Sequence, residues 1–135
     1  ALNDNHGHLG GDQMLVKVSG VLRRCIRSVD QVARYGGEEF AIVLVEATLE
    51  GALDTAQRIR TSVAASEIVF NDRRVSATVS VGVTRCRDTD TGPEDVIARA
   101  DAALYEAKRA GRNRVHCADE TASPAGAMPP ADRPA

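Results

Sequence analysis

The stretch of sequence that decides the fold reads Val32-Ala33-Arg34-Tyr35-Gly36-Gly37-Glu38-Glu39-Phe40-Ala41-Ile42-Val43-Leu44-Val45. Two short apolar runs flank a pair of glycines, a pattern that predicts a β-hairpin. The run after the glycines is apolar on both faces, so we expect that strand to lie inside a sheet. Glycine lacks a Cβ atom, so the pair permits a tight turn and leaves the backbone open to a ligand.

Helical periodicity flanks this hairpin on both sides. Before it, apolar residues recur every three or four positions from Met14 to Val29, which predicts an amphipathic helix. After it, a second apolar stripe predicts a helix from about Leu49 to Ala65, with Thr48 as its N-cap.

Strand periodicity returns after a turn signal at Asn71-Asp72. In residues 75–84 apolar residues alternate strictly with Ser, Thr and Gly, and this predicts one strand. A third helix is predicted from Thr91-Gly92-Pro93-Glu94, a capping-box pattern with proline in the first turn. A short strand is expected near residues 114–116. The order α-β-β-α-β-α-β indicates an α+β fold, with helices on a mostly antiparallel sheet in a ferredoxin-like pattern whose first strand is missing.

Composition limits the class of protein. The 135 residues carry a net charge of -2, with 43% apolar and 3% aromatic residues. The length fits one domain, and the lack of a basic excess argues against nucleic-acid binding. No apolar run approaches the ~20 residues needed to cross a bilayer. Cys25, Cys86 and Cys117 form no CxxC motif, which favours reduced thiols and a cytoplasmic location, with a parent protein that could still be membrane-anchored.

Both ends of the sequence differ from its middle. Residues 119–135 contain four of the five prolines and few large apolar residues, so we expect a disordered tail after a domain of residues 1–118. The chain opens on polar, motif-like sequence without a methionine, so we expect it to be a piece of a longer protein.

Two adjacent carboxylates, Glu38 and Glu39, follow the glycine pair. Mg²⁺ prefers such oxygens and usually takes one or two carboxylates together with phosphate oxygens. A solvated acidic hairpin tip explains the same residues, because acidic glycine-rich turns are common. The residues alone leave both interpretations open.

Gly36-Gly37-Glu38-Glu39-Phe40 resembles the signature of the GGDEF family of diguanylate cyclases, in its GGEEF form. The resemblance runs from about Leu2 to Val115. The other blocks that agree with the family in order and spacing are Asn3-Asp4, Gly7-His8, Gly11-Asp12, Ser80-Val81-Gly82-Val83, Ala100-Asp101, Ala103-Leu104-Tyr105, Ala107-Lys108 and Gly111-Arg112-Asn113.

The resemblance implies a nucleotidyl-cyclase-like fold and a reaction. Such domains condense two GTP molecules into cyclic di-GMP and release pyrophosphate, with Mg²⁺ or Mn²⁺. Each domain binds one GTP, and two domains face each other as a homodimer. The 3′-hydroxyl of one GTP attacks the α-phosphate of the other, so the demands are positioning and charge neutralisation.

The resemblance also implies roles at the hairpin. Glu38 is expected to ligate the metal and to assist deprotonation of the 3′-hydroxyl, with Glu39 as a second catalytic carboxylate near the metal. Gly36 and Gly37 are expected to present backbone to the nucleotide.

Lys108 and Arg112 are implied to neutralise the triphosphate. They are four residues apart near the end of the last predicted helix, which would place them on one face. Without the family, basic residues that favour a helix C-terminus explain the pair equally simply.

Asn3 and Asp12 are implied to read the guanine edge, because a carboxylate accepts from N–H donors that guanine has and adenine lacks. The alternative for Asp12 is a helix N-cap just before the stripe that starts at Met14.

A second site is implied by Arg27 and Asp30, which match the family's RxxD inhibitory site for the product, with Arg58 as a supplementary arginine. Arginine binds phosphate or guanine acceptors in a planar fork. A solvated helix end with a nearby acid is the alternative. We expect product feedback.

The sequence departs from the family at its start. The family's first strand, whose aspartate completes the metal site, lies before Asn3 and outside these residues. We therefore expect residues 1–135 alone to be marginal or inactive, and a sensor domain upstream in the parent. The competing hypotheses are a cyclic di-GMP receptor without turnover, disfavoured by the intact GGEEF, and a structural dimerisation domain.

Overall fold

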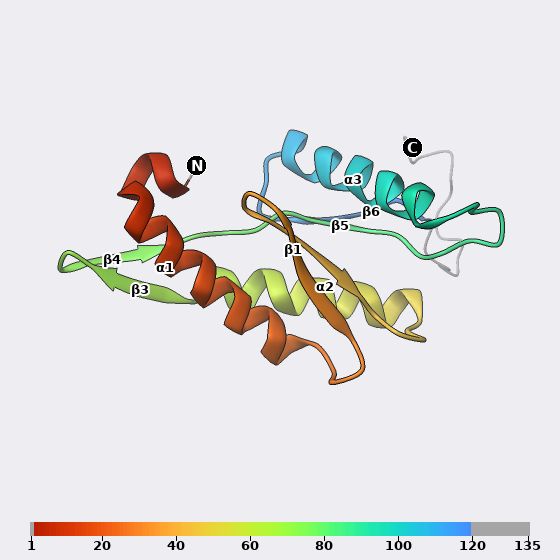
Figure 1. Cartoon of the computed structure of the whole chain (residues 1–135), viewed down its shortest axis with the longest axis horizontal. Coiled ribbons are helices and arrows are strands. Elements are labelled where there is room, and N and C mark those ends of the chain that lie inside the picture. The colour runs from red at the N-terminus through yellow and green to blue at the C-terminus, as the bar shows by residue number, and fades with distance from the viewer. Residues whose placement is uncertain (1, 120–135) are drawn as a thin grey trace.

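The computed structural model describes residues 2–119, with side chains from residue 12 onward. These residues form three helices, α1 (Leu2–Cys25), α2 (Leu49–Ala64) and α3 (Pro93–Arg109). Their six strands are β1 (Gln31–Gly36), β2 (Glu39–Val43), β3 (Glu67–Phe70), β4 (Arg73–Ser76), β5 (Val81–Val83) and β6 (Val115–Cys117) (Figure 1). The predicted α+β class is confirmed. Within the same residues, no helix is long and apolar enough to cross a membrane.

The strands form three separate pairs. β1–β2 and β3–β4 are antiparallel, and β5–β6 is parallel. The prediction of one mostly antiparallel sheet is therefore wrong for residues 2–119. In this part of the chain each of the six strands has a partner on one edge only.

The single strand predicted over residues 75–84 is also wrong. β4 ends at Ser76 and β5 begins at Val81, and residues 77–80 join no ladder. The alternation that suggested a strand is nevertheless real, because Ala77 and Val79 pack against the core while Thr78 is exposed. An apolar face alone does not define a strand when the backbone lacks a neighbour to pair with.

β2 is not an inside strand, contrary to the prediction. It pairs with β1 alone among the described strands, and Val43 on its outer face is 61% exposed. Phe40 and Ile42 face the core instead. In this apolar run the side chains alternate between the core and the outer face of β2, and the outer positions are Ala41 and Val43.

Local signals at the turns and caps are mixed. Thr48 caps α2 as predicted, its hydroxyl accepting from the N–H of Gly51 at 3.0 Å. The capping box at α3 does not form. The Asp95 carboxylate instead accepts from the N–H and hydroxyl of Thr91, at 2.8 and 2.9 Å. The β3–β4 hairpin was not predicted, because β3 is only four residues long.

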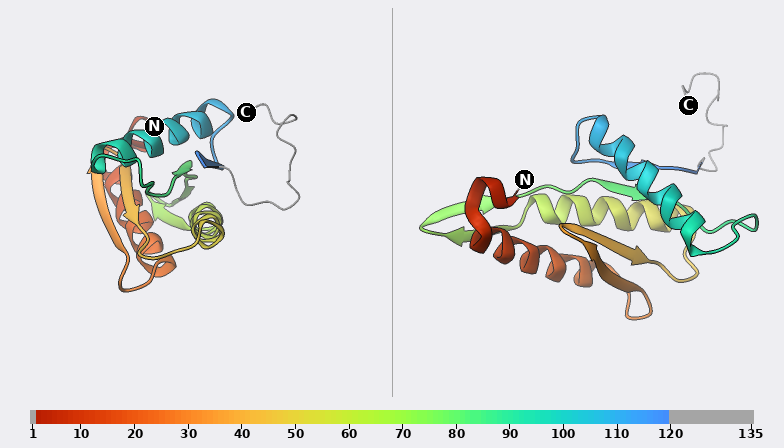
Figure 2. Two further views of the ribbon diagram at one scale, coloured as in Figure 1. Left: turned by 90° about the vertical axis from the view of Figure 1, so that its right-hand side faces the viewer. Right: turned by 45° about the horizontal axis from the view of Figure 1, so that its top comes forward.

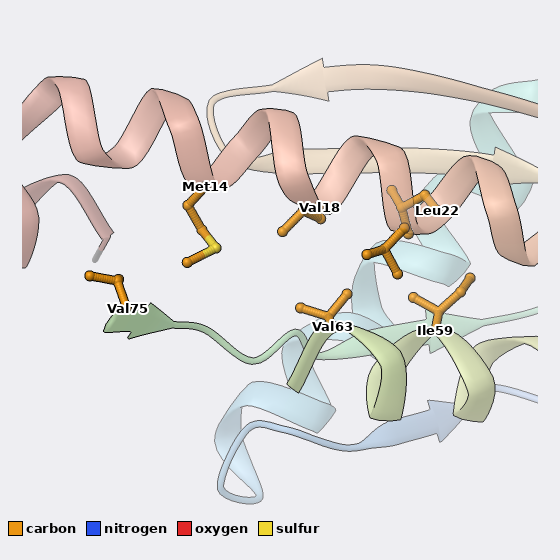
Figure 3. Close-up of a cluster of buried hydrophobic side chains, with 7 residues drawn as sticks. Met14, Val18, Leu22, Ile59, Val63 and Val75 are labelled. Carbon is orange, nitrogen blue, oxygen red and sulfur yellow. The ribbon is translucent and has the colours of Figure 1, made fainter. Parts of the chain in front are cut away.

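The main core lies between α1, α2 and β4. Met14, Val18 and Leu22 of α1 point toward Ile59 and Val63 of α2, with Val75 beside Met14 (Figure 3). Their spacing follows one stripe on each helix, so burying the stripes joins the two helices.

The β5–β6 pair lies between α3 and α2 in both views of Figure 2. Asp119, where the predicted tail begins, is buried after β6, and its carboxylate pairs with Arg87 and accepts from the N–H of Arg85 at 2.8 Å. Asp119 therefore packs with the domain. Residues 120–135 of the predicted tail lie outside the described residues.

Replacing Ile59 by alanine tests the core. Ile59 is 4% exposed, so Ile59→Ala should lower the free energy of unfolding by about 2–5 kcal/mol, from lost burial and the cavity left behind. The matched control is Ile97→Ala on α3, where the side chain is 42% exposed and the loss should be clearly smaller. Urea unfolding of both variants measures the difference, and equal losses would contradict the assigned core.

Candidate active site

The glycine pair forms the tip between β1 and β2. The strand register shifts between Arg34 and Gly36, and Gly37 adopts a φ of 48°, in the left-handed region that glycine tolerates. The Arg34 guanidinium donates two hydrogen bonds to the carbonyl oxygen of Gly37, at 2.9 and 2.7 Å. Arg34 thus braces the tip, a role that the sequence did not suggest.

The two carboxylates lie at this tip, which points toward the C-terminal end of α3 (Figure 1). Glu38 is exposed. Glu39 Oε2 lies 3.8 Å from Nζ of Lys108, and the side chains are 43% and 38% exposed. Such a long, partly exposed ion pair contributes little to stability. The ion pair matters because it places an acidic and a basic side chain from distant parts of the sequence next to each other.

Arg112 does not share a helix face with Lys108, which corrects the sequence interpretation. α3 ends at Arg109, and Arg112 lies in the turn beyond it. Gly111, Arg112 and Asn113 have φ values of 127°, 65° and 50°. A non-glycine residue in this region carries strain, and α3 itself supports the turn, because the N–H groups of Gly111 and Arg112 donate to the carbonyl oxygens of Lys108 and Ala107 at 3.3 and 3.0 Å.

A groove of about 510 Å³ lies between α1 and the hairpin. Asp12 and Ser19 of α1 line one side, and Arg34 and Phe40 line the other. α1 begins at Leu2, so Asp12 lies within the helix and is not its N-cap. The side chain of Asn3, also in α1, lies outside the described side chains.

The residues available to a metal ion are limited. The described part of the chain holds no cluster of three His, Cys, Asp or Glu side chains that could bind one. Glu38 and Glu39 alone fit Mg²⁺ as a partial ligand set, to be completed by phosphate oxygens or a further carboxylate.

Comparisons with known proteins identify the family of this chain. The family model for "Diguanylate cyclase, GGDEF domain" matches residues 1–114. The chain belongs to the GGDEF diguanylate cyclase family.

The GGDEF domain resembles curated proteins across most of its length. Diguanylate cyclase A of Treponema denticola is 40% identical over 84% of this chain, and diguanylate cyclase DgcP of Pseudomonas aeruginosa is 43% identical over 87%. The matched regions cover only 31% and 17% of those two proteins. The chain therefore spans less than a third of the length of these relatives.

Solved structures agree with the fold. The GGDEF domain of DgcB from Caulobacter crescentus, in complex with c-di-GMP, matches with a TM-score of 0.82 and 37% identity, covering 88% of this chain and 69% of that one. The active GGEEF domain of a diguanylate cyclase from Vibrio cholerae matches with a TM-score of 0.78 and 32% identity, covering 89% and 76%.

A second groove of the GGDEF domain, of about 560 Å³, is lined by Arg27, Asp30 and neighbouring residues. The Asp30 side chain is only 2% exposed. Its two oxygens accept four hydrogen bonds, three from the backbone and guanidinium of Arg27 and one from the N–H of Val45, at 2.8–3.0 Å. A carboxylate has about four acceptor positions, so a ligand that reaches Asp30 must displace one of these donors.

Arg58 makes its hydrogen bond away from this pair. Its guanidinium donates to the carbonyl oxygen of Cys25 at 3.0 Å, which joins α2 to the last residue of α1. The Arg27 side chain is 55% exposed, although its Nε and Nη2 donate to Asp30 and Nη2 also donates to the carbonyl oxygen of Val45.

The Asp30 contacts predict a pH dependence of stability. Hydrogen bonds from Arg27 hold the pKa of the Asp30 carboxyl well below its usual range. A carboxyl with a depressed folded pKa stabilises the fold fully above its unfolded pKa near 4, and that contribution is lost as the pH falls toward the folded value. The stability gap between wild type and Asp30→Asn should therefore be constant from about pH 7 to 5 and shrink below about pH 4.

Denaturant unfolding at pH 7, 5 and 3 measures this gap. Asp54→Asn, at an exposed position of α2, is the matched control and should show little gap at any of these pH values. A gap for Asp30→Asn that stays the same down to pH 3 would contradict the assigned ion pair.

Proposed function

We propose that this domain condenses two GTP molecules into one cyclic di-GMP and two pyrophosphates, as part of a longer protein. Two copies face each other, each holding one GTP. The 3′-oxygen of each GTP forms a bond to the α-phosphorus of the other, each 3′-hydroxyl loses its proton, and one pyrophosphate departs from each α-phosphorus. The observation that carries the proposal is the pairing of Glu39 at the glycine turn with Lys108 of α3, which sets carboxylates and a phosphate-binding base side by side.

The proposed residue roles divide between the hairpin tip, which carries Glu39, and the end of α3, which carries Lys108. Glu38 and Glu39 hold Mg²⁺ or Mn²⁺, which would supply charge neutralisation at the phosphates. Glu38 also takes up the proton of the 3′-hydroxyl. Gly36 and Gly37 let the nucleotide approach the backbone, and Lys108 and Arg112 bind the triphosphate.

Guanine lies in the groove between α1 and the hairpin. Asp12 lines that groove, and a carboxylate there accepts from the N1–H and N2–H₂ donors of guanine. Asn3 precedes Asp12 on the same helix and is the second residue proposed to read the base.

Product feedback acts through the second groove. Arg27 offers its exposed guanidinium to the phosphate or guanine of cyclic di-GMP, Asp30 holds that guanidinium in place, and Arg58 supplements it. The similar GGDEF domain of DgcB was solved in complex with c-di-GMP, which supports a product-binding capacity in domains of this fold.

The ferredoxin-like sheet is completed by a strand from outside these 135 residues. Two observations support this proposal, namely the open edge that every strand has within residues 2–119 and the strand-like alternation of residues 77–80. That strand also contributes a further metal-binding carboxylate. Residues 1–119 would then be most of one catalytic domain, with a sensor domain elsewhere in the full-length protein.

GTP turnover by the full-length protein tests the proposal. With Mg²⁺ present, Glu38→Ala should lower kcat at least about 100-fold, the scale of removing one charge-stabilising group from an active site. Glu94→Ala is the matched control, because this exposed glutamate lies at the opposite end of α3 from Lys108, and its kcat should stay within twofold of wild type.

Two results would change the assignment. Absence of turnover by the full-length wild type, with cyclic di-GMP still bound, would favour a receptor module. Turnover by residues 1–135 alone would overturn the proposed need for an additional strand and carboxylate.

Calorimetry with cyclic di-GMP tests the feedback site. Arg27→Ala should weaken binding at least about tenfold, because a charge-assisted contact is lost. Arg73→Ala, an exposed arginine in the β3–β4 hairpin, serves as control and should bind like wild type. Unchanged affinity in Arg27→Ala would remove this site from the account.

A further inference from the structure

α3 packs directly on the backbone of β5 at Gly82. A Cβ atom built on Gly82 would lie 2.5 Å from the carbonyl oxygen of Ala100 and 2.9 Å from Cα of Leu104, and it would also collide with the Leu104 nitrogen. All three are backbone atoms, so no side chain can rotate away. To restore an ordinary contact of 3.4 Å, the helix would have to move by about 1 Å.

The same helix carries the phosphate-binding end of the proposed site. Lys108 follows Leu104 by about one helical turn, and its Nζ lies 3.8 Å from Glu39 on the hairpin. The depth at which α3 sits on Gly82 therefore fixes where Lys108 meets the hairpin tip. A displacement of this size is enough to change rates or affinities greatly when charged groups must be aligned.

Residues 80–81, next to Gly82, contact the turn that contains Arg112. The N–H of Asn113 donates to Oγ of Ser80 at 3.2 Å, and the N–H of Val81 donates to the carbonyl oxygen of Arg114 at 2.9 Å. These two hydrogen bonds tie the far side of the left-handed turn to residues 80–81. The N–H of Arg112 donates to the carbonyl oxygen of Ala107 in α3 at 3.0 Å, so the turn is held by α3 on one side and by residues 80–81 on the other, in a conformation that a non-glycine residue rarely adopts unaided.

We propose that Ser80 and Gly82 are positioning residues for the substrate triphosphate: Gly82 holds Lys108 at the hairpin tip through the depth of α3, and Ser80 holds Arg112 through the shape of the turn after α3. This inference rests on the proposed function, since it assigns phosphate binding to those two basic residues. Ser80 and Gly82 act through Lys108 and Arg112 and do not themselves bind the nucleotide.

The test compares two ligands in the full-length protein with Mg²⁺. The α,β-methylene analogue of GTP carries a triphosphate that cannot be cleaved at the bond broken in the reaction, and GMP carries only one phosphate. The ratio of the two dissociation constants isolates the β- and γ-phosphate contacts. A general loss of folding would lower both affinities together and leave the ratio unchanged.

Gly82→Ala should weaken binding of the analogue at least about tenfold while GMP binding stays within twofold of wild type. Ser80→Ala removes one hydrogen bond and should cost about three- to tenfold for the analogue alone. The matched control is Gly20→Ala in α1, where an added Cβ meets only the end of the Arg24 side chain, at 3.7 Å, and both affinities should be unchanged.

The outcomes separate the two proposals. A wild-type protein that binds the analogue no better than GMP overturns the proposed function and this inference with it. A wild type that prefers the analogue, with both variants showing the same preference, overturns the positioning role alone. If Gly82→Ala does not fold, Ser80→Ala decides, and an unchanged ratio in that variant overturns the inference.

Discussion

The buried carboxylate of Asp30 is the contact on which the geometry of the site depends. Its oxygens bind the loop that follows α1 and, through the N–H of Val45, the chain that leaves β2. Arg27 strengthens this junction by donating to the carbonyl oxygen of Val45 at 2.5 Å as well as to Asp30. The base of the β1–β2 hairpin is thereby fixed relative to α1, so the tip with Glu38 and Glu39 projects in a defined direction. Satisfying all four acceptor positions offsets the cost of burying the charge.

The other half of the site comes from the last third of the chain. Arg99 joins the N-terminal half of α3 to the loop after β5, donating to Asp90 at 2.8 and 2.9 Å and to Oγ1 of Thr84 at 2.8 Å. The bidentate contact from Arg99 lowers the pKa of Asp90 to about 2. Together with the close approach at Gly82, these contacts fix α3 on β5 along its length, so Lys108 reaches Glu39 from a rigid support.

The two grooves are neighbours in space. Arg23 and Val32 line both of them, one from the last turns of α1 and the other from β1. The proposed substrate groove thus lies on one side of these residues and the proposed product groove on the other. A change in how the hairpin meets α1 would alter both grooves. The first groove is lined by α1 and the hairpin, and Asp30, which joins them, lines the second.

Much of this arrangement was predictable from local pattern. The glycine hairpin, the apolar stripes of the helices, the Thr48 cap and the Asn71–Asp72 turn depend on neighbouring residues, whose sterics and hydrogen bonds act within a few positions of the chain. The family resemblance also came from motifs in sequence order, and the family model matches the same region.

Tertiary structure decided what depends on contacts between distant segments. Local alternation does not specify which strands pair. Within residues 2–119, pairing divided residues 75–84 between two strands and gave β2 one neighbour. The helix end at Arg109 separated Arg112 from the face of Lys108, and the 3.8 Å contact of Lys108 with Glu39 joins residues far apart in sequence. The sequence by itself determined which side chains are available for the chemistry. Their placement required packing of α3 on a glycine in β5 and burial of Asp30, because such contacts form only when the whole chain is folded.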